Sequence, residues 1–206
     1  MNTSFRPIAH VIRLRTMLAM RPDGGFKTFR DLVDYAKANP GKLAYGTSDV
    51  GSLTHSMMVM VEKAAGIETL HIPYKGDADV MTALIGGQVQ IALGSPDQLK
   101  PWIDAGKMVP LTLSSNDRFP GLPAVPTLKE LGYDIYLENM KGIVAPAGLP
   151  DEVYAYLSDR LQKAMQTEAF KAQVARFNFE VQYMDGPTFG RTTQSMSAGI
   201  AAALKK

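Results

Sequence analysis

The stretch LAYGTSDVGS (residues 43–52) decides the fold class, because a short apolar run is joined there to a helix-like run by a glycine-rich turn. Gly46 and Gly51 have the spacing of a phosphate-binding loop, but such a loop continues with Lys and then Ser or Thr, where this chain has Ser52-Leu53. The turn still offers backbone N–H groups and the positive end of a helix dipole. The stretch therefore predicts an uncharged anion cradle that suits a carboxylate as well as a phosphate.

A second interpretation fits the same residues. In an ordinary strand–turn–helix junction, Ser52 is a plain N-cap and no ligand is bound. His55, one helical turn after Ser52, orients the serine or reaches a ligand under the first interpretation, and is hydrogen-bonded behind the turn under the second. The stretch alone leaves both interpretations open, so the rest of the chain has to decide.

Apolar runs with the length of strands alternate with helical patterns along the chain, which predicts an α/β fold. Capping residues mark where most of the helices begin, and glycines mark where several end. The predicted strands are 17–20, 43–45, 70–72, 89–93, 111–113 and 142–145. The predicted helices begin at Thr28, Ser52, Asp77 or Asp79, Ser95, Asp151, Glu168 and Pro187, with a short one after Thr127 in the irregular segment 116–132.

The pattern of predicted helices and strands changes after residue 139. Residues 21–139 read as one compact α/β unit, whereas the C-terminal third is predicted to be nearly all helix. Its amphipathic helices need a sheet that this third does not supply. We therefore expect residues 140–206, together with residues 1–20, to belong to a different part of the fold.

Composition excludes several classes of function. The 206 residues are 46% hydrophobic and carry a net charge of +2 with scattered basic residues, so we expect a folded protein that binds no nucleic acid. The absence of Cys excludes disulfides and thiol catalysis, and no His is spaced with a carboxylate as a metal ligand, so we predict no metal and no cofactor. Pro7, Arg13 and Arg15 interrupt the apolar residues near the start, so any export signal lies outside this chain.

A carboxylate site needs hydrogen-bond donors without a competing base. We expect free backbone N–H groups around Gly51 and Ser52, serine and threonine hydroxyls, and a cation from the Pro-Tyr-Lys-Gly turn, while Asp49 faces solvent at the tip of the loop. The candidate ligand-binding residues are Gly46, Thr47, Ser48, Gly51, Ser52, His55, Lys75, Gly76 and Ser95.

Hydrolase chemistry is the less favoured alternative. The Gly46-x-Ser48-x-Val50 pattern resembles a nucleophile elbow but lacks the glycine at its fifth position. Asp49, Ser52 and His55 are so close along one turn that they do not align as a catalytic triad beside an oxyanion hole. We therefore predict that the protein is not an enzyme.

Several ordered phrases across nearly the whole chain resemble the solute-binding proteins of tripartite tricarboxylate transporters, also called the Bug or TctC-like family. No single phrase is specific, but their number and order are. The phrases are TFRDL (28–32), AKANPGKL (36–43), YGTS (45–48), GS (51–52) with His55, IPYKG (72–76), LIGGQV (84–89), AGK (105–107), Arg118 with LPAVPT (122–127), ELG (130–132) and APAGLP (145–150).

The resemblance implies a type II-like periplasmic binding protein with two α/β lobes that close over a small carboxylate and deliver it to membrane permease subunits. It implies that residues 21–139 form the second lobe, and that residues 1–20 and 140–206 are the crossover and the helical part of a first lobe that lacks its N-terminal strands. The ligand is then a di- or tricarboxylate, an amino acid or an aromatic acid. Exposed helices of the incomplete lobe would favour self-association.

The same architecture also serves as the ligand-sensing module of regulators, which is a second alternative. A regulator needs a DNA-binding helix-turn-helix, and this sequence shows none. A secretory signal upstream would favour transport, whereas a helix-turn-helix upstream would favour regulation.

Overall fold

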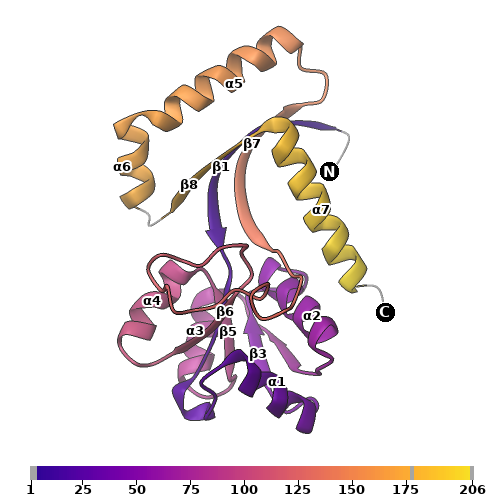
Figure 1. Ribbon diagram of the computed structural model, residues 1–206, viewed down its shortest axis with the longest axis vertical. Helices are drawn as coiled ribbons and strands as arrows, with labels where there is room; N and C mark the ends of the chain where they lie inside the picture. Colours follow the sequence, from indigo (N-terminus) through magenta and orange to yellow (C-terminus); the bar gives the residue numbers. More distant parts are fainter. Residues whose placement is uncertain (1–3, 177–178, 205–206) are drawn as a thin grey trace. The chain divides into compact units, whose positions relative to one another are not determined.

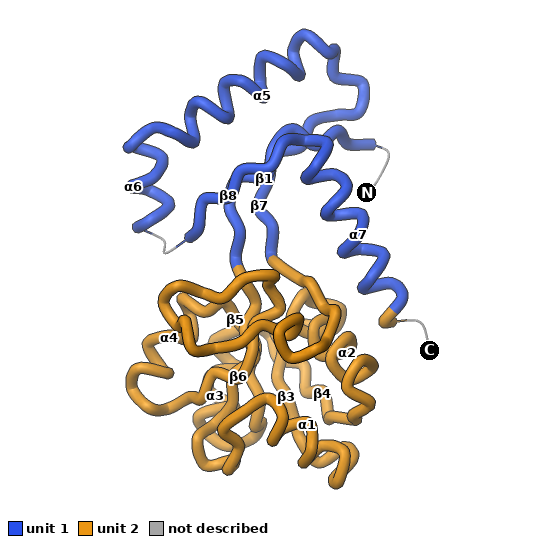
Figure 2. The backbone as a smooth tube through the Cα atoms, in the orientation of Figure 1, with its two compact units in different colours: residues 1–14, 139–202 blue, residues 15–138, 203–206 orange. Residues whose placement is uncertain are grey.

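The computed structural model describes residues 4–176 and 179–204, and the chain forms two compact units (Figure 2). Unit 2 comprises residues 15–138 and 203–206, and unit 1 comprises residues 1–14 and 139–202. Helices and strands alternate along the chain, which confirms the predicted α/β class. The sequence placed the start of the α/β part at residue 21, whereas strand β2 (Met17–Met20) lies inside the sheet of unit 2.

Unit 2 is built on a five-stranded sheet with strand order β4-β3-β5-β2-β6. Strand β3 (Ala44–Thr47) runs parallel to β4 (Leu70–Pro73) and β5 (Ile91–Gly94). Strand β2 runs antiparallel to both β5 and β6 (Val109–Leu113). All five strands lie where the sequence predicted them, because each is a short apolar run between turn residues.

Four α-helices accompany this sheet (Figure 1). They are α1 (Phe29–Ala38), α2 (Leu53–Ala65), α3 (Asp77–Ile85) and α4 (Pro96–Asp104), and a short 3-10 helix, η1, spans Pro22–Gly24. The predicted caps are confirmed at Thr28, Ser52 and Ser95, whose hydroxyl oxygens each accept a backbone N–H of the following helix. Such a cap satisfies one of the N–H groups that a helix start leaves without an internal partner.

The core of unit 2 lies on both sides of β2, whose four residues are all fully buried. One cluster of the core joins β2 and β5 to helices α3 and α4 through buried apolar side chains. Its members include Met17, Ala19, Val80, Leu84, Ala92, Leu99 and Leu113. This packing holds α3 and α4 against the sheet and so determines where their first turns lie.

Unit 1 has a three-stranded sheet with the order β7-β1-β8. Its strands are β1 (Phe5–Arg15), β7 (Glu138–Pro146) and β8 (Glu180–Asp185), and its helices are α5 (Asp151–Gln166), α6 (Glu168–Arg176) and α7 (Gly186–Leu204). Strand β8 pairs antiparallel with β1, with Ala9 opposite Asp185 and Arg13 opposite Glu180.

Two predictions for the later part of the chain are wrong. The C-terminal third is not nearly all helix, because β8 supplies a strand whose alternating exposure has the period of a β-strand. Its polar residues hid that pattern. No helix follows Thr127 either. The N–H of Thr127 donates to the Glu130 carboxylate at 2.8 Å, and the N–H of Glu130 donates to the Thr127 hydroxyl oxygen at 3.1 Å, as in a capping box. The turn nevertheless ends at Gly132, which has a φ of 89°.

Candidate functional site

Three strand-to-helix turns meet at one edge of the sheet in unit 2. Strands β3, β4 and β5 run parallel, so their carboxyl ends share that edge, and α2, α3 and α4 begin directly after them. Open α/β sheets bind their ligands outside the carboxyl ends of the strands. This edge is therefore the candidate site, and it brings together the predicted residues of 46–55, 75–76 and 95.

The strand register places Ser48 at the middle of this edge. Thr47 pairs with Pro73 of β4, and Gly46 pairs with Ala92 of β5. Ser48 directly follows Thr47, whose carbonyl accepts the N–H of Tyr74 at 2.8 Å, so the chain leaves β3 beside the turn that follows β4. Ser48 is half-buried, and because β3 lies between β4 and β5 in the sheet, the turn after β3 lies between the turns that follow those two strands.

Within the turn where free N–H groups were expected, those of Gly51 and Ser52 themselves are used. The N–H of Gly51 donates to Nδ1 of His55 at 2.9 Å, and the N–H of Ser52 donates to the carbonyl of Asp49 at 3.4 Å. A residue with the left-handed φ of Gly51 (82°) bends the chain back toward its own helix, which brings these partners together. Sequence alone does not show this bend, so it could not show that the two groups are used.

Other N–H groups of the same turn are free instead. Those of Ser48, Asp49, Leu53 and Thr54 donate to no residue in the described part of the chain, and neither does the Ser48 hydroxyl. Leu53 and Thr54 open α2, so the positive end of its dipole lies with them. Asp49 is exposed and its carboxylate accepts the N–H of Val50 at 2.8 Å, in line with the expected position at the loop tip.

A stack of rings supports this turn from behind. The ring centroids of His55 and His71 lie 4.2 Å apart, with an interplanar angle of 17°. The ring of Tyr45 also stacks on that of His71, with a distance of 4.8 Å between the centroids. Because Nδ1 of His55 accepts the Gly51 N–H, His55 holds the turn in place. This arrangement matches the interpretation in which His55 is hydrogen-bonded behind the turn.

The hydroxyl of Thr47 is not available to a ligand. Its Oγ1 lies 2.6 Å from Nε2 of His71 and 2.9 Å from the carbonyl oxygen of Asp49. A hydroxyl has one hydrogen, so Thr47 donates to Asp49 and accepts from a His71 that is protonated on Nε2. Thr47 therefore links β4 to the turn instead of facing an anion.

Burial lowers the pKa of His71, and the neighbouring His55 lowers it further. The folded protein therefore binds fewer protons at this site than the unfolded chain, whose histidines titrate near 6.5. Stability is fully present above that pH and falls as the pH drops through 6.5 toward the lower pKa of the folded state. We expect the urea midpoint of unit 2, followed by Trp102 fluorescence, to be lower at pH 5.5 than at pH 7.5.

His71→Gln should flatten this pH dependence, because a neutral amide can still donate to Thr47. His10→Gln is the matched control: burial also lowers the pKa of His10, but that residue lies in unit 1. An undiminished pH dependence in His71→Gln would rule out His71 as its origin.

The remaining predicted residues have different roles. Lys75 is exposed and makes no ion pair with any residue that the structure describes, so its cation is free. The carbonyl of Gly76 starts α3 by accepting N–H groups of Asp79 and Val80 at 3.1 and 3.2 Å. At Gly46, a Cβ would lie 3.0 Å from Val80 and 3.1 Å from the Tyr74 ring, so this glycine serves packing. The hydroxyl oxygen of Ser95 caps α4.

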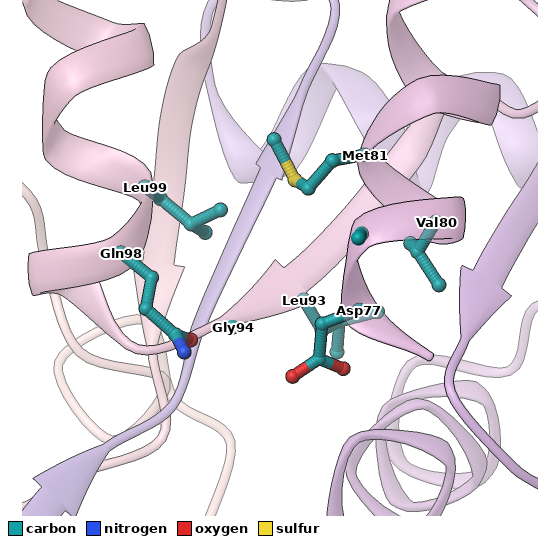
Figure 3. Close-up of a pocket in the computed structure, with 8 residues that line it drawn as sticks. Asp77, Val80, Met81, Leu93, Gly94, Gln98 and Leu99 are labelled. Atoms are coloured by element: carbon teal, nitrogen blue, oxygen red, sulfur yellow. The ribbon is translucent and has the colours of Figure 1, made fainter. Parts of the chain in front are cut away.

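A cavity that was not predicted lies between α3 and α4, at the carboxyl end of β5 (Figure 3). Its volume is about 150 Å³. It is lined by Asp77, Ala78, Val80, Met81, Leu93, Gly94, Gln98 and Leu99. These residues come from three separate elements and read individually as helix starts or core positions, so no sequence pattern marks them.

The described residues form neither a catalytic Ser–His pair at Ser52 nor a metal site. No hydrogen bond joins the His55 ring to Oγ of Ser52, which instead accepts the backbone N–H of His55 at 3.2 Å and contacts Oγ1 of Thr54 at 3.1 Å. Across residues 4–176 and 179–204, no three His, Asp or Glu side chains gather as metal ligands. Among the same residues, none of the helices combines the length and apolar character of a membrane span.

The sequence and the fold both match known proteins. Residues 2–206 match the tripartite tricarboxylate transporter family receptor, TctC. A UPF0065 protein in the gbd 5' region of Cupriavidus necator is 37% identical over 176 residues, which are 84% of this chain and 53% of that protein. The chain thus spans about half the length of the curated relatives that it matches.

Two solved structures resemble the chain over 97% of its length. A TctC solute-binding protein from Polaromonas, solved without ligand, has a TM-score of 0.85 at 26% identity, and the match covers 68% of that chain. The R. palustris protein Rpa4515, solved with adipate, has a TM-score of 0.74 at 25% identity, with 66% of its chain covered.

Proposed function

The chain belongs to the tripartite tricarboxylate transporter receptor family, TctC, and we propose that it captures a small organic carboxylate for delivery to a membrane permease. The solved relatives are solute-binding proteins, a class that binds without catalysing a reaction, and one of them holds adipate. Members of the family are periplasmic binding proteins, so we place this capture in the periplasm.

One observation carries the proposal. Four N–H groups and the Ser48 hydroxyl, none of which donates to a residue that the structure describes, lie in a single turn at the positive end of the α2 dipole and at the carboxyl edge of the sheet. Hydrogen bonds from such donors to an ionised carboxylate are about twice as strong as those between neutral groups. The free cation of Lys75, one turn away along the edge, adds a long-range attraction for an anion.

The lobe assignment is part of the same proposal: unit 2 is the second lobe, and unit 1 belongs to the first. Unit 1 leaves many large apolar side chains exposed, which supports a first lobe whose helices pack against further protein. Without that protein, self-association is the expected way to cover this surface. The exposed residues are Phe5, Ile143, Val144, Val153, Tyr156, Phe179, Val181 and Tyr183.

Matched pairs of ligands test the proposal. We expect calorimetry and ligand-observed NMR to detect binding of carboxylates such as succinate, glutamate and benzoate, but not of the corresponding amides. An amide keeps the size and polarity of the ligand and removes the charge that the N–H groups favour. Because closure needs a complete first lobe, we expect weak, millimolar affinity, of about 4 kcal/mol. Equal binding of benzoate and benzamide would refute an anion site.

A further inference from the structure

The cavity between α3 and α4 is apolar inside and polar at one end. Val80, Met81, Leu93 and Leu99 supply its apolar lining, and their side chains come from both helices and from β5. In Figure 3 the polar ends of Asp77 and Gln98 lie on either side of Gly94, while Met81 and Leu99 lie together farther along the cavity. A cavity of about this volume has room for a molecule the size of benzene.

This cavity lies at the same end of the sheet as the turn after β3, which holds the free donors. Strands β3 and β5 are paired up to Gly46 and Ala92, and Gly94, two residues after Ala92, lines the cavity. Gly46 also lies close to the cavity, because a Cβ built on it would be 3.0 Å from the lining residue Val80. A carboxylate held at Ser48 would therefore have its hydrocarbon part next to the cavity entrance. Gln98 accepts the N–H of Ser95 through Oε1 at 3.4 Å, so the NH₂ group of its amide is not used in this bond.

Charge at the rim restricts what can enter. Asp77 lines the cavity and is exposed, and its carboxylate pairs with no cation in the described part of the chain. A second carboxylate on the ligand would meet this negative charge, whereas a hydrocarbon end would not. The apolar lining likewise offers no donor to an ion that loses its water.

We propose that this cavity binds the hydrocarbon part of the ligand, and that Asp77 selects a monocarboxylate over the dicarboxylate of matching size. The inference rests on the proposed carboxylate site at Ser48. The ligand is then a small acid with an apolar group of about six carbon atoms, such as an aromatic ring.

The test compares benzoate with terephthalate, and hexanoate with adipate, by calorimetry on the full chain. We expect each monocarboxylate to bind about tenfold more tightly than its dicarboxylate at low salt, as Coulomb repulsion over a few ångströms predicts. Asp77→Asn should remove most of this preference. Asp79→Asn, a loss of the same charge in the same helix but outside the cavity, should leave it intact.

A second pair of variants tests the volume of the cavity. Ala78→Leu should fill it and weaken benzoate about tenfold while leaving acetate unchanged, because acetate needs only the donors at Ser48. Ala64→Leu makes the same change at an exposed position of α2 and should affect neither ligand.

The outcomes separate this inference from the proposed function. If carboxylates bind but Asp77→Asn and Ala78→Leu change nothing, the cavity is not part of the site and the proposed function stands. If Ala78→Leu weakens benzoate and acetate alike, the ligand does not extend into the cavity. If benzoate binds no better than benzyl alcohol, the carboxylate site fails, and this inference fails with it.

Discussion

Ser48→Asp is expected to lower the affinity for any carboxylate at least about 100-fold. The new side chain would accept the N–H groups that otherwise bind the ligand, so the ligand loses charge-assisted hydrogen bonds of about 2 kcal/mol each. Two like charges about 4 Å apart near a protein surface add between about 1 and 4 kcal/mol of repulsion. Together these effects exceed the 2.7 kcal/mol that corresponds to about a 100-fold change.

The control for this variant is Gln88→Glu. It adds the same charge to unit 2 at an exposed residue just before β5, at the opposite edge of the sheet. Circular dichroism should show that both variants are folded, because Ser48 is only half-buried and its hydroxyl has no partner among the described residues. Unchanged binding in Ser48→Asp would exclude the turn after β3 as the carboxylate site, whereas a loss in Gln88→Glu would point to net charge instead.

The parts of unit 2 that the sequence predicted well depend on local chemistry. Thr28, Ser52 and Ser95 cap their helices because each needs only a hydroxyl and an N–H three residues later. Gly66 ends α2 with a φ of 64°, a conformation that glycine adopts without steric cost. In these cases the interacting groups are near one another in the chain, so their spacing is enough to predict the contact.

The features that the sequence did not predict depend on residues far apart in the chain. His71 comes from β4, yet it determines the role of Thr47, and only the pairing of β3 with β4 brings them together. The cavity depends on how α3 and α4 pack across β5. Strand β1 was not predicted, because Pro7, His10 and Arg13 interrupt its apolar pattern. His10 is nevertheless fully buried, and the centroid of its ring lies 5.5 Å from that of Phe189.

Gly186→Ala is expected to destabilise unit 1 by about 3 kcal/mol, the upper part of the usual range for overpacking. Gly186 is buried at the start of α7, and a Cβ there would overlap the Pro7 carbonyl oxygen and the Tyr154 hydroxyl. A side chain could rotate away, but the carbonyl belongs to the backbone of β1, so the strand or the helix must move. Unit 1 has few buried apolar residues with which to compensate: Ile8, Ala9, Ala145, Met165, Val174 and Phe189.

Hydrogen exchange followed by mass spectrometry should show this loss as faster exchange in β1, β8 and α7, with little change in the five-stranded sheet. Gly190→Ala is the matched control, because it makes the same change one turn later in α7, where the nearest atom to a new Cβ is Cγ of Pro7 at 3.4 Å. That is an ordinary contact, and alanine favours a helix interior over glycine by about 1 kcal/mol, so exchange should slow. Opposite effects from the two Gly-to-Ala changes would match the difference in space around the two Cα atoms. Equal effects would mean that α7 does not pack against β1 as described.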